Sequence, residues 1–224
     1  MLTKQVKIKQ FDVASKKVTS NSDFILIDQT LFINYPDNSY KISTTFDHID
    51  DLVQGLSYIQ SGNLKKLLIS QHEDQISVNL KSELLNVPSP IDITSINIQH
   101  DHIVTWLSEF RDQQRLYHQT GATVAVGVPT NDQMLVMECV SPLSCYSKLI
   151  GSIVRNDQTY HPIIFCSHPI RMDTLDLILA LKPEIIVSQS AISSGVLDAL
   201  ISHNITVFGF CRKRKYNRYS NFHI

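Results

Sequence analysis

The chain has 224 residues, of which 43% are hydrophobic and 18% charged, with a formal net charge of -1 and a pI near 6.7. This composition is typical of a globular protein that buries a core without disulfides, and it excludes a disordered chain. The near-neutral charge argues against a generally basic nucleic-acid-binding protein. With only seven glycines, the chain has no G-x-G-x-x-G, P-loop or HExxH motif, so the common dinucleotide, phosphate-loop and zincin sites are not expected.

The four cysteines, at positions 139, 145, 166 and 211, form no CxxC pair. This usage predicts free thiols in a reducing compartment. The zinc deaminase signature is absent. A metal site made of Cys139, Cys166, His168 and Cys211 is geometrically conceivable, but the spacings match no known metal pattern, so we expect no metal site. The N-terminus alternates apolar and polar residues and lacks a signal core, and no run approaches the roughly 18 apolar residues of a membrane span. We therefore expect a cytoplasmic protein that does not enter the membrane.

The first hundred residues are predicted to be mainly strands. Strands at 24–28, 31–34 and 40–43 are expected to form a hairpin or meander around a turn at 35–39. A helix is expected to begin at Asp47 and to stop at Ser61-Gly62. Strands at 67–70 and 76–80 follow, which predicts a strand-rich N-terminal module at 1–100.

From residue 101 onward the pattern changes to strands that alternate with helices. A helix at 102–118, capped by Asp101, is expected first. The later predicted strands are 122–128, 134–140, 162–166, 185–188 and 205–211, and the later predicted helices are 142–154, 169–181 and 191–202. Short apolar strands separated by amphipathic helices favour a three-layer α/β/α core at 101–224 with largely parallel strands.

Three of these strands end in polar or reactive residues that lead into helices. They are Glu138-Cys139-Val140-Ser141, Cys166-Ser167-His168 and Ser188-Gln189-Ser190. In parallel strands these ends share one sheet edge, where helix N-termini attract anions. The run Arg212-Lys213-Arg214-Lys215 follows the last strand and would lie at the same edge. Each feature also has an ordinary structural interpretation: buried small cysteines, helix caps and a solvated tail.

Several segments resemble motifs of a known family. Residues 205–212 and 216–219 resemble a closing "GiTlvGFxR…fnvY" pattern, Ser188-Gln-Ser-Ala191 resembles an "SrSaP" turn, and Thr120-Gly121 resembles a "TGG" start. Further matches are Glu138, Val140, Lys148 and Ile150-Gly151 to "EDVGRHNAvDKviG", and Leu52, Gly55 and Gly62 to "eLavGfLlsEG". On these motifs the chain resembles the FdhD/NarQ family of formate dehydrogenase accessory proteins over about residues 24 to 222.

The resemblance implies a cytidine-deaminase-like core fold without the deaminase zinc. It also implies a sulfurtransferase that takes sulfur as a persulfide from a cysteine desulfurase and passes it to the molybdenum cofactor of formate dehydrogenase. Family members bind the bis-molybdopterin guanine dinucleotide form of that cofactor as a client, hold no permanent cofactor, and are usually homodimers. The family's cofactor-binding stretch maps onto Phe210, Cys211, Arg212, Lys213, Arg214 and Lys215, to which the strand-end residues Ser188 and Ser190 are added.

The chain departs from the family pattern at the sulfur site. The family carries sulfur on a CxxC loop, whereas this chain has no cysteine before position 139. The "DVGRHNA" segment is replaced by Cys139-Val-Ser-Pro-Leu-Ser-Cys145, "SGR" by Ser167-His168-Pro169, and Glu by Asp173. Cys139 and Cys145 are the candidate sulfur carriers, because a nearby helix N-terminus lowers the pKa of a thiol; the alternative is that both are neutral buried thiols.

Three functions are therefore considered. The first is molybdenum-cofactor sulfuration or delivery by a formate dehydrogenase accessory protein. The second is a non-catalytic, degenerate paralogue that binds the guanine dinucleotide or a partner protein. The third is an unrelated metal or nucleotide enzyme on a deaminase-like core. Guanine-nucleotide binding separates the first two from the third, and a persulfide on Cys139 or Cys145 separates the first from the second.

Overall fold

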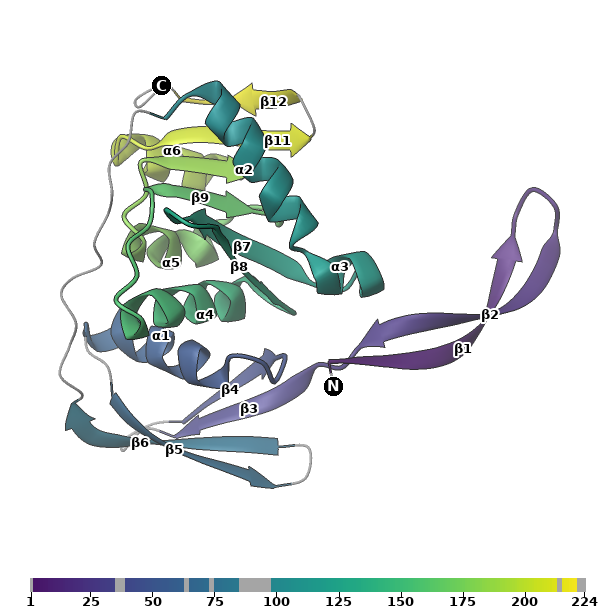
Figure 1. Cartoon of the computed structure of the whole chain (residues 1–224), viewed down its shortest axis with the longest axis horizontal. Helices are drawn as coiled ribbons and strands as arrows, with labels where there is room; N and C mark the ends of the chain where they lie inside the picture. Colours follow the sequence, from purple (N-terminus) through teal and green to yellow (C-terminus); the bar gives the residue numbers. More distant parts are fainter. Residues whose placement is uncertain are drawn as a thin grey trace.

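A computed structural model describes residues 2–34, 39–62, 65–72, 75–84, 98–212 and 215–220. These residues form an α/β body with a long two-stranded arm projecting from it (Figure 1). The arm is the antiparallel hairpin of β1 (Thr3–Asp12) and β2 (Lys17–Leu26). Residues 24–26, expected in a hairpin with 31–43, belong instead to this arm.

A four-stranded sheet follows, with the order β4-β3-β6-β5. Its strands are β3 (Gln29–Asn34), β4 (Ser39–Thr44), β5 (Lys65–His72) and β6 (Gln75–Leu84). The β3–β4 and β5–β6 pairs are antiparallel, in agreement with the predicted hairpin and the predicted second strand pair. Strands β3 and β6 are parallel to each other. The predicted turn at 35–39 lies outside the described residues except for Ser39, the first residue of β4.

Helix α1 (Ile49–Ser61) packs its apolar stripe on this sheet. Leu52 and Val53 join Leu31, Ile33 and Val78 in one fully buried cluster. The helix ends where predicted, because Gly62 adopts the left-handed conformation that a side chain disfavours.

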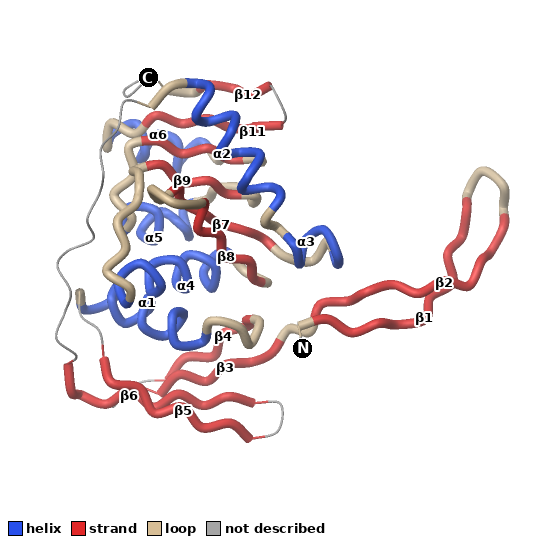
Figure 2. The backbone as a smooth tube through the Cα atoms, in the orientation of Figure 1, coloured by secondary structure: helices blue, strands red, loops and turns tan. Residues whose placement is uncertain are grey.

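The second sheet has six strands in the order β12-β11-β10-β9-β7-β8 (Figure 2). The strands are β7 (Val124–Pro129), β8 (Met134–Cys139), β9 (Ile163–Cys166), β10 (Ile185–Ser188), β11 (Thr206–Arg212) and β12 (Lys215–Arg218). Only β9, β10 and β11 pair in parallel, so the expectation of a largely parallel sheet is wrong for β7, β8 and β12. However, β8 is antiparallel to β7 and β7 to β9, so β8 runs in the same direction as β9. The carboxyl ends of β8, β9, β10 and β11 therefore share one edge of the sheet, as the sequence predicts.

Helices cover both faces of this sheet. On one face α4 (Pro142–Arg155), α5 (Leu175–Ala180) and α6 (Ser194–Ser202) bury an apolar cluster against the strands. On the other face α2 (His100–Asp112) packs Phe110 against Phe165. Ser141 caps α4, as predicted: its hydroxyl accepts the backbone N–H of Ser144 at 3.3 Å, and Pro142 opens the helix.

The predicted helix 102–118 is two helices. α2 ends at Asp112, and α3 (Arg115–Thr120) begins after a break at Gln113 and Gln114. The physical reason is Glu138 at the end of β8, whose carboxylate accepts the backbone N–H groups of Leu116 at 2.9 Å and Tyr117 at 2.8 Å. This anion holds the N-terminus of a new helix, and a continuous helix would use those N–H groups internally.

Gln99, and not Asp101, is the N-cap of α2.

Three further boundaries differ from the predictions. The segments after β9 and after β10 stay extended at Ile170 and Ile192, which form a parallel β-bridge with each other. The helical residues therefore begin at Met172 and Ser194, and not at the predicted positions 169 and 191. A short 3-10 turn, Met172–Thr174, precedes α5. Lys215 begins β12, which is antiparallel to β11, so this part of the basic run lies in a strand and not in a tail, while Arg212 and Lys215 are both exposed to solvent.

Candidate functional site

A cavity of about 310 Å³ lies at the carboxyl edge of the six-stranded sheet. Its lining comes from the ends of three strands and from α2 and α3: Arg111, Gln114, Tyr117, His118, Ser167, Gln189, Ser190, Cys211 and Arg212. A cavity at the carboxyl ends of parallel strands is the usual ligand position in an open α/β sheet.

Local hydrogen bonds fix the strand-end wall of the cavity. The Ser167 hydroxyl accepts the backbone N–H of Ala125 at 2.8 Å, which joins the end of β9 to β7. The backbone N–H of Ser190 donates to the Ser188 hydroxyl at 3.1 Å, and Ser188 itself is fully buried. The turn after β10 is therefore held in place without using the Ser190 side chain.

The cavity is rich in hydrogen-bond donors. Arg111 and Arg212 supply guanidinium groups. The side-chain Nε2 atoms of Gln114 and Gln189 are buried beside the cavity and have no hydrogen-bond partner among the described residues. Leaving a buried donor unpaired costs about 1–3 kcal/mol, so these two amides are polar groups that the described part of the fold does not satisfy. The lining thus suits an anionic or acceptor-rich ligand.

The structure brings only some of the predicted cofactor-binding residues to this cavity. Ser190, Cys211 and Arg212 line it. Ser188 lies beneath the wall, and Lys215 is exposed on β12, paired in register with Arg212. Phe210 is 42% exposed and has a left-handed backbone (φ 52°), with its N–H bound to the Ser190 carbonyl. Lys213 and Arg214 lie outside the described residues.

Six lining residues were not named as cofactor-binding residues: Arg111, Gln114, Tyr117, His118, Ser167 and Gln189. Ser167 and Gln189 directly follow predicted strands, and the sequence already places them at this anion-attracting edge. The four others sit where the single predicted helix breaks in two, and the pattern of the helix itself contains no signal for that break.

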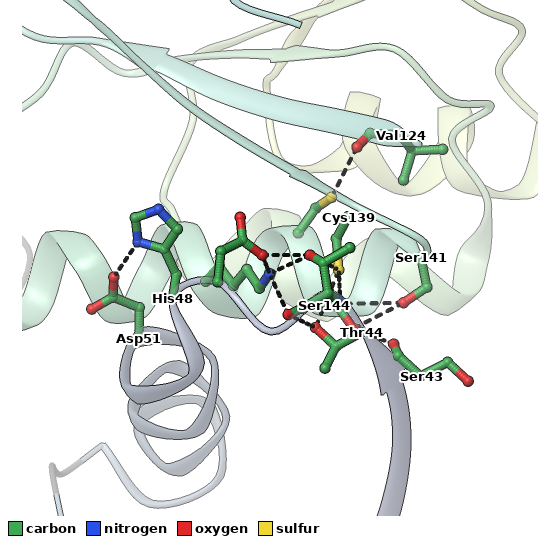
Figure 3. Close-up of polar contacts among 12 residues, drawn as sticks. Ser43, Thr44, His48, Asp51, Val124, Cys139, Ser141 and Ser144 are labelled. Carbon is green, nitrogen blue, oxygen red and sulfur yellow. Dashed lines mark hydrogen bonds and ion pairs between the residues drawn. The ribbon is translucent and has the colours of Figure 1, made fainter. Parts of the chain in front are cut away.

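A second group of polar residues gathers where β8 ends, beneath the loop that joins β4 to α1 (Figure 3). The Cys139 sulfur is fully buried, 3.2 Å from the Thr44 hydroxyl and 3.5 Å from the backbone nitrogen of Thr45. Lys148, also fully buried, donates to the Asp47 carboxylate at 2.7 Å and to the Thr45 hydroxyl at 2.9 Å. A buried ammonium, a carboxylate and a thiol therefore share one site.

The electrostatics of this site distinguish Cys139 from the other cysteines. Burial alone would raise the pKa of the Cys139 thiol, but the Lys148 ammonium and the hydrogen bonds from Thr44 and Thr45 outweigh burial and lower it. Burial raises the pKa of Cys145 well above its usual value, and that thiol donates to the Val124 carbonyl at 3.2 Å. Burial also raises the pKa values of Cys166 and Cys211 to about 12.

Asp47 completes the charge balance of this site. Burial raises the pKa of its carboxyl, but Lys148 and the Thr45 hydroxyl lower it further than burial raises it. Asp47 therefore stays a carboxylate beside the buried lysine. Among the described residues no group of three or more His, Cys, Asp or Glu side chains could hold a metal ion.

The fold and this sheet-edge cavity now allow a comparison with known proteins. The model of the FdhD/NarQ family matches residues 37–223, and the chain belongs to this family. The fold is similar to the crystal structure of a "putative formate dehydrogenase accessory protein" from Desulfotalea psychrophila. The TM-score is 0.77, the match covers 97% of each chain, and the sequence identity is 16%. No curated protein matches the chain in sequence.

Proposed function

We propose that this protein is a formate dehydrogenase accessory protein and that its sheet-edge cavity takes the guanine-dinucleotide end of the molybdenum cofactor as cargo. The observation that carries the proposal is the cavity itself, which lies at the carboxyl edge of the sheet and is lined by Arg111 and Arg212 together with Gln114 and Gln189. A guanine offers ring and carbonyl acceptors, and a pyrophosphate offers the anionic oxygens that arginine binds in pairs. The cavity is at the small end of ligand sites, which fits part of a nucleotide better than a whole dinucleotide cofactor.

Sulfur transfer to the cofactor is the second part of the proposal. Cys139 is the better of the two candidate carriers, because its pKa is lowered while that of Cys145 is raised. Only a thiolate attacks sulfur, and Cys145 would have to lose its hydrogen bond to Val124 and ionise in an apolar core. The donor in this scheme is a cysteine desulfurase, and the client is formate dehydrogenase in the cytoplasm. No described helix is long and apolar enough to span a bilayer.

A homodimer is the third part, and the β1–β2 arm supports it. The arm exposes large apolar side chains, among them Phe11 and Val18, which are 58% and 59% exposed. The arm is also basic, because it carries lysines at positions 4, 7, 9, 16 and 17 and only two acidic residues, Asp12 and Asp23. The whole chain, in contrast, has a net charge of -1. A basic, partly apolar ribbon and a net acidic remainder attract each other between two copies. An isolated two-stranded hairpin is only marginally stable in water, so contact with a partner would stabilise it.

Titration calorimetry with GDP tests the cavity. Arg212→Ala combined with Lys215→Ala is expected to weaken binding at least tenfold, and more at low salt because ionic contacts are screened by salt. Lys9→Ala, on the arm, is the matched control and should leave the affinity unchanged. Undetectable GDP binding to the unaltered protein would reject the proposal.

The alternative is a non-catalytic paralogue that binds the cofactor or a partner without transferring sulfur. The absence of the family's CxxC loop is the specific observation in its favour. GDP binding without any persulfide, after incubation with a cysteine desulfurase and cysteine, would establish this alternative.

A further inference from the structure

A short chain of polar groups connects the buried Cys139 sulfur to the protein surface. The Thr45 hydroxyl lies 3.6 Å from this sulfur and 2.5 Å from the Asp47 carboxylate. The Asp47 side chain is 28% exposed, so its carboxylate exchanges protons with solvent. The Thr45 hydroxyl thus lies between the fully buried Cys139 thiol and the partly solvent-exposed Asp47 carboxylate.

Lys148 sets the direction of these hydrogen bonds. An ammonium only donates, so the Thr45 hydroxyl accepts from Lys148 and its own proton is left for Asp47 or for Cys139. The Lys148 ammonium is fully buried and donates to three oxygens: the Asp47 carboxylate, the Thr45 hydroxyl and the Thr45 carbonyl. It is held in place as a fixed positive charge beside the thiol.

The groups that surround the sulfur are donors suited to an anion. The Thr45 backbone N–H donates to it at 3.5 Å, and the Thr44 hydroxyl, 3.2 Å away, can give its single proton to the sulfur or to the Thr45 carbonyl. The charged and titratable groups nearby are Asp47 and His48 of the loop, Asp51 of α1, Glu138 of β8, and Cys145 and Lys148 of α4. Glu138 is engaged by backbone N–H groups of α3, and Asp51 by Arg155, so Lys148 is the charge placed to act on the sulfur.

We propose that Thr44, Thr45 and Lys148 form a thiolate-holding site for Cys139, with Asp47 as the exit for its proton, and that this thiolate accepts sulfane sulfur. The inference rests on the sulfur transfer proposed above. The Cys139 thiolate attacks the outer sulfur of a donor persulfide and forms a new S–S bond. The S–S bond of the donor breaks, and the donor leaves as a thiolate. The Cys139 proton passes through the Thr45 hydroxyl to Asp47 and then to water, so atoms and charge balance.

The loop at residues 45–48 is part of the cover over this site. Cys139 is fully buried and Thr45 of the loop contacts its sulfur, so a donor reaches Cys139 only when this cover moves. The loop ends at His48, a non-glycine residue in the left-handed region (φ 51°), and His48 gives α1 no side-chain cap. Such a conformation stores about 1–3 kcal/mol of strain, which makes this junction the natural place for the loop to open.

The ultraviolet absorbance of thiolate, followed against pH, tests the ionisation without requiring access to the sulfur. The difference between the unaltered protein and Cys139→Ser isolates Cys139. Its midpoint is expected below the usual thiol value of about 8.5. Thr44→Val and Lys148→Met should each raise the midpoint; for Lys148→Met we expect about one unit, a tenfold loss of thiolate at pH values below the midpoint. Thr44→Val is nearly isosteric and serves as the measurement if Lys148→Met does not fold.

Persulfide mapping after incubation with a cysteine desulfurase and cysteine tests the transfer. The modification is expected on Cys139. At pH values below the midpoint it should fall about tenfold in Lys148→Met, and in Thr44→Val it should fall in step with the thiolate fraction of that variant. A midpoint at or above the usual thiol value, or a persulfide on another cysteine, overturns the inference. No persulfide together with normal GDP binding also overturns it but leaves the cofactor site standing, whereas loss of GDP binding removes the proposed function itself.

Discussion

Gly55 of α1 and Gly151 of α4 face each other where the two helices cross. A Cβ built on Gly55 would lie 1.8 Å from the Ser147 carbonyl oxygen, and one built on Gly151 would lie 1.8 Å from the Asp51 carbonyl oxygen. The contact atoms are backbone, which cannot rotate away. The strand-rich N-terminal part and the α/β core are thus joined at a point that no side chain can occupy.

Gly55→Ala and Gly151→Ala are each expected to cost at least about 3 kcal/mol of unfolding free energy, or to prevent folding, because the helices must separate to admit the methyl group. Denaturant unfolding measures this. Gly195→Ala in α6 is the matched control, since its nearest neighbours lie at an ordinary 3.7 Å. That variant should be neutral or slightly stabilising, because alanine favours helix over glycine. Comparable losses in all three variants would contradict the close crossing.

The Asp47–Lys148 ion pair should respond unequally to removal of its two members. Asp47→Asn leaves a fully buried ammonium without its carboxylate and is expected to cost about 3 kcal/mol. Lys148→Met leaves a carboxylate that water already reaches, so we expect less than half of that loss. Chemical denaturation of both variants and of the double variant gives the coupling. A larger loss for Lys148→Met would show that the lysine, and not the pair, is what the fold needs.

Gln114 is expected to lower the stability of the free protein and to contribute to ligand binding. This residue lines the cavity, and its buried Nε2 atom has no hydrogen-bond partner among the described residues. Gln114→Leu is therefore expected to raise the unfolding free energy of the free protein by about 1 kcal/mol and to weaken GDP binding about tenfold. Gln133→Leu, at an exposed position, should change neither quantity. A stability loss in Gln114→Leu would mean that the amide is satisfied within the free protein.

Acid should destabilise the fold through Asp47 and Asp51. Burial raises the pKa of the Asp51 carboxyl, but His48 and Arg155 outweigh burial, so the net shift is downward, as it is for Asp47. A carboxyl with a lowered folded-state pKa stabilises the fold above its unfolded value, here 3.8, and loses that contribution as pH falls through the folded value. The unfolding free energy should therefore drop below about pH 4. Asp51→Asn should flatten this drop, and an unchanged acid profile would contradict the pairing with Arg155.

The arm should determine the oligomeric state. Phe11 and Val18 are cross-strand partners on one face of the hairpin, so replacing both with serine removes apolar contact area without breaking the backbone pairing. Light scattering of the unaltered chain is expected to give a dimer, and Phe11→Ser with Val18→Ser to shift it toward the monomer. GDP affinity, measured in the same samples, should not change. A dimer that survives the double substitution would place the interface elsewhere.

The sequence predicted those parts of the fold whose signals are local. Helix α1 has its apolar spacing and Gly62, α4 has Ser141 and Pro142, and β10 lies at the predicted residues. Signals that come from distant residues were missed. The break between α2 and α3 depends on Glu138, more than 20 residues away, and the direction of β7 depends on which strands it joins in the sheet.

The same distinction applies to the candidate sites. Ser190 and Arg212 were placed at the cavity because residues that follow parallel strands meet at one edge, and Cys211 was assigned through the family resemblance. The character of Cys139 depends on Thr44 and Thr45, some 95 residues earlier in the chain, and on a lysine whose burial no spacing reveals. For this reason the sequence left Cys139 and Cys145 equivalent, whereas their surroundings in the fold separate them.

Glu138 and Cys139 are consecutive residues of β8, and each holds one of the two sites. Glu138 anchors α3, which carries Tyr117 and His118 into the cavity wall, while Cys139 lies under the loop before α1. A single peptide bond thus connects the cavity wall to the thiol. The residue that carries the thiol and the residue that anchors the cavity wall are therefore neighbours on one strand, and a substitution at either position has to be judged for its effect on both sites.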